Sequence, residues 1–131
     1  MAVQVSAEVR NGVLVVDAQG SRAARDVDAY DEVCLRWYWV AQECVRHRVD
    51  RVLYRSRVHG RGSSSVTLRV FTDFARFRSP RSAQIAMLRV GDRTKQVMEL
   101  GVKVAQSDGW NIRLFESEDE ATAWLGAVDP T

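Results

Sequence analysis

The dipeptide Asn11-Gly12 separates two segments of apolar pattern, and it constrains the fold more than any other feature of the chain. Before it, residues 3–10 alternate between apolar and polar side chains, the period of a strand with one buried face. After it, residues 13–18 (VLVVDA) are almost continuously apolar at first, which is typical of a strand covered on both faces. Asn-Gly tolerates the positive φ angles that a type I′ turn needs. The segment therefore predicts a β-hairpin that opens the protein.

Downstream, helical and strand periods alternate. Spacings of three and four predict a helix over 27–46, with Asp26 as its N-cap, and place these side chains inward: Val27, Tyr30, Cys34, Trp37, Ala41, Cys44 and Val45. A second helix is predicted from Val66 to before Pro80, with an inward stripe of Val70, Phe71, Phe74 and Phe77. A third is predicted to follow Gly91-Asp92 and run to about Ser107, with Val97, Leu100, Gly101 and Val104 inward. Strands are predicted at 51–56, 83–90 and 111–116.

The segment Ser117 to Glu120 matches the capping box, in which a serine and a glutamate satisfy each other's backbone donors, and it predicts a last helix. Strands that alternate with helices imply right-handed crossovers and a mostly parallel sheet. The sequence thus predicts one α/β domain over residues 1–131, with an N-terminal β-hairpin followed by βαβ units. The expected sheet is five-stranded, mixed and mostly parallel, with about four helices and the first strand at an edge.

Two large apolar residues of the first predicted helix, Leu35 and Trp39, fall outside its main stripe. They either form a flank beneath a neighbouring element or provide a contact surface for another chain. Exposure of both would indicate a homodimer.

No apolar run approaches the roughly 20 residues that a membrane helix requires. Residues 1–10 lack the apolar core of a signal peptide, so we expect a cytoplasmic protein. Cys34 and Cys44 lie about 15 Å apart along the predicted helix, too far for a disulfide, and are expected to be buried, reduced thiols.

The stretch EVRNGVLVVDAQGSRAARDVDAY resembles the opening of a STAS domain, in which the second strand of a hairpin ends in a glycine before a helix. The tail, IAMLRVGD and then GVKVAQSDGWNIRLFESEDEATAWL, is similar to the SpoIIAA-like branch, that of the bacterial anti-sigma-factor antagonists. The resemblance covers nearly the whole chain in element order. It implies a SpoIIAA-like fold and a bacterial regulatory protein that acts by protein–protein interaction.

In that family a serine at the start of the helix after the third strand accepts a phosphoryl group from a partner kinase. By position, the resemblance assigns this role to Ser63, Ser64 or Ser65. The acid that precedes the hydroxyl residues in the family pattern and the glycine that follows them are both absent here, and Arg57 and Arg61 stand nearby instead.

The residues themselves leave two interpretations of this segment open. Glycines, serine hydroxyls and the arginines at 55, 57 and 61 can form an anion-binding site at a helix N-terminus. Alternatively, the glycines make the turn and one serine is the N-cap. Asp17, near the end of the second strand, is a weaker ligand-binding candidate.

Nothing in the sequence assigns catalytic residues. There is no phosphate-binding Gly-rich loop with its lysine and no nucleophile elbow, and two cysteines and two scattered histidines do not make a metal site. We therefore expect a non-enzymatic regulatory module without cofactor or metal, whose partner is another protein. The first alternative is a carrier of a small apolar or lipid-like ligand, held between the phenylalanine-bearing helix and the sheet. A minor alternative is nucleic-acid binding through residues 46–81, which contain ten arginines and two acids.

Overall fold

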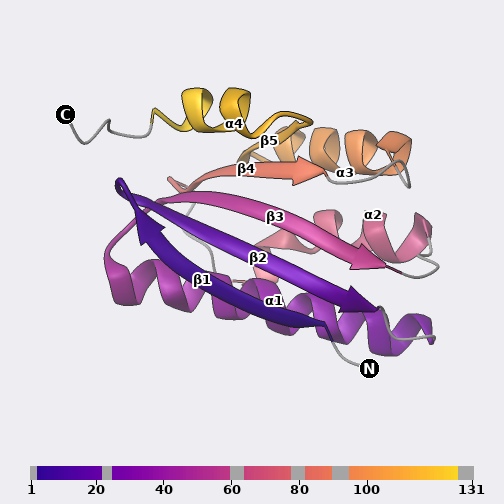
Figure 1. Cartoon of the computed structure of the whole chain (residues 1–131). Helices are drawn as coiled ribbons and strands as arrows, with labels where there is room; N and C mark the ends of the chain where they lie inside the picture. Colours follow the sequence, from indigo (N-terminus) through magenta and orange to yellow (C-terminus); the bar gives the residue numbers. More distant parts are fainter. Residues whose placement is uncertain (1–2, 22–24, 60–63, 78–81, 90–94, 127–131) are drawn as a thin grey trace.

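The computed structural model describes residues 3–21, 25–59, 64–77, 82–89 and 95–126. Its strands form one sheet in the order β1-β2-β3-β4-β5, in which β1 and β2 are antiparallel and all other neighbours are parallel (Figure 1). This arrangement confirms the predicted α/β class, the five-stranded mixed sheet and the edge position of the first strand. In chain order the elements are β1 (Gln4–Arg10), β2 (Val13–Ser21), α1 (Asp26–His47), β3 (Arg51–His59), α2 (Ser64–Thr72), the 3₁₀ helix η1 (Phe74–Phe77), β4 (Gln84–Arg89), α3 (Lys95–Ser107), β5 (Asn111–Phe115) and α4 (Glu118–Leu125).

The opening hairpin turns at the predicted dipeptide. Asn11 and Gly12 have φ angles of 51° and 78°, both in the left-handed region that a type I′ turn requires. Asparagine and glycine adopt this region at the lowest cost. The turn sets the register, so that Arg10 pairs with Val13 and the alternate apolar residues of β1 face α1.

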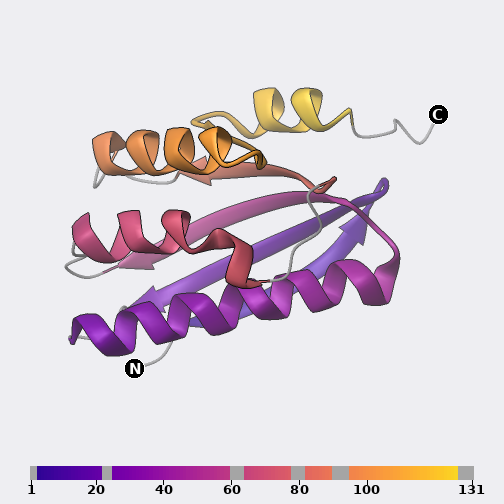
Figure 2. The same cartoon turned by 180° about the vertical axis from the view of Figure 1, so that it is seen from behind.

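The helices divide unequally between the two faces of the sheet. α1, α2 and α3 cover one face, whereas α4 packs on the other, mainly over β4 (Figure 2). Strand alternation gives each face its own hydrophobic cluster: Tyr54 of β3 belongs to the larger cluster beneath α1–α3, and its neighbour Leu53 belongs to the smaller cluster beneath α4. Successive right-handed crossovers that advance in one direction along a sheet leave their helices on one side, which explains the shared face of α1–α3.

Two of the predicted helices differ from the structure at their boundaries. α2 begins at Ser64, two residues earlier than predicted, and ends at Thr72, after which η1 continues the chain. α1 begins at Asp26, so Asp26 is not its N-cap; Arg25 takes that position, and its side chain makes no capping hydrogen bond. The predicted last helix is confirmed, and the Ser117 hydroxyl accepts a hydrogen bond from the backbone N–H of Glu120, which is the serine half of the predicted capping box.

Some predicted inward residues face solvent. Val27 and Val45 of α1 and Leu100 of α3 are 54%, 72% and 51% exposed, whereas Val40, which the prediction left out, is buried. The spacing of apolar residues shows only roughly which side of a helix is buried. The exact residues that are buried depend on the elements that pack against the helix. Gly101 is confirmed as inward-facing: a Cβ at this position would overlap the ring of Phe71 in α2, so glycine allows α2 and α3 to approach closely.

Candidate functional site

The serine-rich segment leads from β3 into α2, where Ser64 and Ser65 occupy the first turn. Ser65 is exposed. Residues 60–63, which include Arg61 and Ser63, lie outside the described residues, and their roles stay predictions. The carboxyl ends of β2, β3 and β4 meet at the same edge of the sheet as the N-terminal ends of α1, α2 and α3. Open α/β sheets bind ligands at this edge, so α2 begins where a binding surface is expected.

Arg57 lies on a different face of the sheet from α2. Along β3, Tyr54 belongs to the cluster beneath α1–α3, whereas Leu53 belongs to the cluster beneath α4. Because side chains alternate, Arg55 and Arg57 share the α4 face with Leu53. The structure therefore separates the exposed Arg57 from the helical layer that contains Ser64 and Ser65.

Arg55 is not available to an anion, which corrects the prediction that it supplies charge to the serine segment. Its guanidinium donates to both carboxylate oxygens of Asp17, at 2.8 and 2.7 Å, and to Glu118 at 2.9 Å. These hydrogen bonds to Asp17 and Glu118 raise the already high pKa of Arg55 further, against the opposing effect of burial. Asp17 and Arg55 are register partners on β2 and β3, and Glu118 opens α4, so this arginine ties two strands to the last helix. The ligand-binding interpretation of Asp17 is accordingly replaced by a structural one.

A polar cluster that the sequence did not indicate joins α1 to the end of α2. The Tyr30 hydroxyl donates a 2.5 Å hydrogen bond to Asp73, and Arg69 lies 3.6 Å from the same carboxylate with its guanidinium 4.2 Å from the Tyr30 ring centroid. Burial, together with the hydrogen bonds to Asp73 and Cys34, raises the pKa of Tyr30 to about 12. The one available signal was a tyrosine on a core-facing stripe, because a buried hydroxyl requires a partner.

The structure divides the pair Leu35 and Trp39. Trp39 is partly buried and packs against the larger core cluster, whereas Leu35 is 70% exposed. Trp39 thus fits the interpretation as a flank beneath a neighbour, and the role of both residues in an interface stays a prediction.

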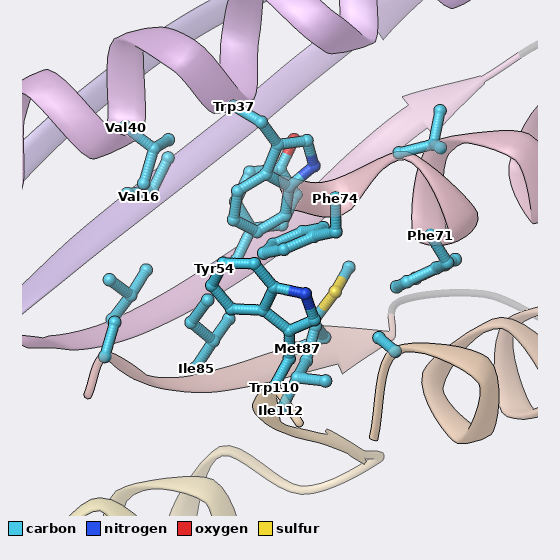
Figure 3. Close-up of a cluster of buried hydrophobic side chains, with 14 of the residues drawn as sticks. Val16, Trp37, Val40, Tyr54, Phe71, Phe74, Ile85, Met87, Trp110 and Ile112 are labelled. Atoms are coloured by element: carbon cyan, nitrogen blue, oxygen red, sulfur yellow. The ribbon is translucent and has the colours of Figure 1, made fainter. Parts of the chain in front are cut away.

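Phe71 and Phe74 belong to the core, whereas the side chain of Phe77, also predicted to face inward, lies outside the described part of the structure. Phe74 is fully buried, with ring centroids 5.1 Å from those of both Trp37 and Trp110, and Trp37 stacks on Tyr54 at 4.5 Å (Figure 3). These rings occupy the space between the helices and the sheet, so the packing supplies no observation in favour of an apolar ligand there. Buried Phe71 and Phe74 are likewise not presented for stacking on bases.

Other chemistry finds no support in the described residues. Within these ranges no three potential ligands among histidine, cysteine, aspartate and glutamate gather as a metal site would require. Both cysteines are free; Cys44 is buried and Cys34 partly so. Burial, aided by the charges of Asp50 and Glu43, raises the pKa of the Cys44 thiol to about 11. Among the described helices, none has the length and apolar character needed to cross a membrane.

Comparison with known proteins supports the fold. The chain is similar in structure to an anti-sigma factor antagonist from Mycobacterium paratuberculosis, with a TM-score of 0.63 and 16% sequence identity over 95% of each chain. No protein-family model matches the sequence. A search of curated proteins finds no match either. The predicted SpoIIAA-like resemblance is therefore confirmed as a likeness of fold.

Proposed function

We propose that this chain is a non-enzymatic regulatory module that docks a partner protein through the edge of the sheet at which α2 begins. The observation that carries the proposal is the likeness in fold to an anti-sigma factor antagonist, which spans 95% of both chains. By that analogy the partner is an anti-sigma factor, and one of Ser63, Ser64 and Ser65 accepts a phosphoryl group or lies beside a bound anion.

The position of α2 supports a switch at these serines. A phosphoserine in the first turn of a helix is stabilised by the positive end of the helix dipole. It adds about −1.5 to −2 charges to the surface at this point. A partner that docks on the unmodified surface would lose affinity.

Arg69 connects the serines of α2 to the contact between α1 and α2. It lies four residues after Ser65, so the two side chains share a face of α2. A phosphate on Ser65 would compete with Asp73 for this arginine, and Asp73 also accepts the hydrogen bond from Tyr30. Phosphorylation would therefore weaken the contact between α1 and α2 as well as change the docking surface.

The test is incubation of the purified chain with ATP and serine kinases of the anti-sigma class from the source genome, followed by fragment mass spectrometry and size-exclusion chromatography. We expect a complex with one kinase and phosphate on one of Ser63–Ser65. Ser117 is the matched control, because it also stands at a helix start but its hydroxyl already accepts the Glu120 N–H. Absence of any complex, or phosphate at Ser117 rather than at Ser63–Ser65, would argue against the proposal.

A further inference from the structure

Ser65, Arg69 and Asp73 follow one another at spacings of four residues along α2 and the residue after it, so they form one row on the helix surface. Asp73 continues the helical hydrogen-bond pattern, because its backbone N–H donates to the carbonyl of Arg69 at 2.8 Å. Arg69 therefore stands between a carboxylate on one side and an exposed serine on the other, each about one turn away. A phosphate on Ser65 would give this arginine a second anionic partner.

In the unmodified chain the side chain of Arg69 is directed to the C-terminal end of this row. Its Nε lies 3.6 Å from Oδ2 of Asp73, and its guanidinium carbon lies 4.2 Å from the centroid of the Tyr30 ring. The same Asp73 oxygen accepts the hydrogen bond from the Tyr30 hydroxyl, so the arginine takes part in the contact between α1 and α2. The ion pair is weak, since 3.6 Å exceeds the usual length of a charge-assisted hydrogen bond and the Arg69 side chain is 63% exposed.

The direction of the helix favours the other partner. An ion pair at this spacing is more stable when the anion precedes the cation, as a phosphate on Ser65 would precede Arg69, than when it follows, as Asp73 does. Helical side chains also lean toward the N-terminus, so Ser65 lies in the direction that an arginine takes most readily. A phosphoserine carries about −1.5 to −2 charges and three strong acceptor oxygens, more than a carboxylate offers. The first turn of α2 contains no acidic side chain that would compete for the arginine.

We propose that Arg69 is a two-position switch, which contacts Tyr30 and Asp73 in the unmodified chain and moves to the phosphate when Ser65 is phosphorylated. This inference rests on the function proposed for the α2 edge and assigns the modification to Ser65. Ser64 is excluded as the phosphate that Arg69 binds, because it precedes Arg69 by five residues and lies about 140° away around the helix. The move withdraws the cation from the Tyr30 ring, so the modification is transmitted from the docking edge to α1.

A full chain synthesised with a phosphate already on Ser65 tests the switch without any kinase or partner. Titration followed by ³¹P NMR measures the second pKa of the phosphate, which a neighbouring guanidinium lowers. Arg69→Gln should raise this phosphate pKa by about 0.3, whereas Arg69→Lys keeps the charge and should raise it less. A phosphate on Ser64 is the matched control, and there Arg69→Gln should leave the pKa unchanged. Equal pKa values for the phosphate on Ser65 in wild type and in Arg69→Gln overturn the proposal.

The NMR resonances of the Tyr30 ring measure the other position of the arginine. A phosphate on Ser65 should move them toward their positions in Arg69→Gln, because both changes withdraw the cation from the ring, and a phosphate on Ser64 should not. Asp73→Asn removes the competing anion and should lower the pKa of the phosphate on Ser65 further. Circular dichroism confirms that each variant is folded.

Tyr30 resonances that stay unchanged when Ser65 carries the phosphate overturn the switch. The function proposed for the α2 edge fails on a different result, the absence of any kinase that modifies these serines or of any partner that binds. The two failures are distinguishable because the phosphate is installed during synthesis.

Discussion

The two faces of the sheet are held to their helices by different forces. Beneath α1–α3, aromatic rings from α1, β3, η1 and the loop between α3 and β5 contact one another around fully buried Phe74. Beneath α4 the apolar cluster is smaller, and Arg55 adds a charged link from two strands to the start of the helix. The layer of α1–α3 is thus stabilised mainly by the apolar area that it buries. The eight-residue helix α4 buries less and gains further stability from the hydrogen bond that Arg55 donates to its first residue.

The largest expected effect comes from the aromatic face. Phe74→Ala removes a ring that is completely buried between Trp37 and Trp110, and we expect it to lower the free energy of unfolding by about 3–5 kcal/mol. Urea denaturation followed by tryptophan fluorescence and circular dichroism measures the loss. Phe115→Ala on the α4 face is the matched control and should cost less, because Phe115 retains some exposure and contacts the partly buried Trp124. Equal losses would remove the distinction between the faces.

A smaller effect is expected from the charged link. Arg55→Met keeps the aliphatic part of the side chain but leaves Asp17 and Glu118 without this arginine. We expect a loss of about 1–2 kcal/mol, below that of a fully buried ion pair because both carboxylates are partly exposed.

Arg57→Met is the control for that variant, since Arg57 is exposed on the same strand face, and it should change stability by less than about 0.5 kcal/mol. High salt should narrow the gap between wild type and Arg55→Met. If the two variants unfold at the same urea concentration, the link contributes nothing and the α4 face depends on apolar packing alone.

The sequence predicted the features that depend on residues close together in the chain, and it did not predict those that depend on contacts between distant segments. Periodicity and local chemistry gave the hairpin at Asn11-Gly12 and the cap at Ser117, because each depends on residues that are neighbours in the chain. The link between Asp17 and Arg55 depends on the register of two strands separated by α1, and no local pattern contains that register. The inward assignment of Val45 was wrong for a related reason: the width of the buried arc depends on elements far away in the sequence.

The candidate site was predicted only in part for the same physical reason. The start of a helix after β3 follows from the apolar spacing, so Ser64 and Ser65 were placed near its N-terminus. Which arginines lie beside these serines depends on strand alternation and on partners from other elements. Arg55 was thus assigned to the wrong site, and the interaction of Arg69 with Tyr30 and Asp73 was not predicted.

The smallest expected effect comes from the hydrogen bond between Tyr30 and Asp73. It is a polar contact within the layer of α1–α3, the face of the sheet that is otherwise stabilised by apolar packing. Tyr30→Phe deletes the hydrogen bond to Asp73 and keeps the ring, and we expect a loss of about 1 kcal/mol near neutral pH. The pKa of Tyr30 is raised to about 12 in the folded protein, against about 10 for a tyrosine in an unfolded chain. The folded state therefore holds this proton more tightly, and the stabilisation is complete below pH 10 and is lost as the pH rises from about 10 to about 12.

Urea denaturation of wild type and Tyr30→Phe in parallel from pH 8 to about pH 11 measures this loss, since other titrating groups are common to both proteins and cancel in the difference. Tyr38→Phe, at an exposed position of the same helix, should match wild type. A difference between wild type and Tyr30→Phe that stays constant above pH 10 would mean that the hydroxyl contributes through packing alone. The layer of α1–α3 would then be stabilised by apolar packing alone. Of the two faces, only the α4 face would gain stability from a polar contact, that of Arg55 with Asp17 and Glu118.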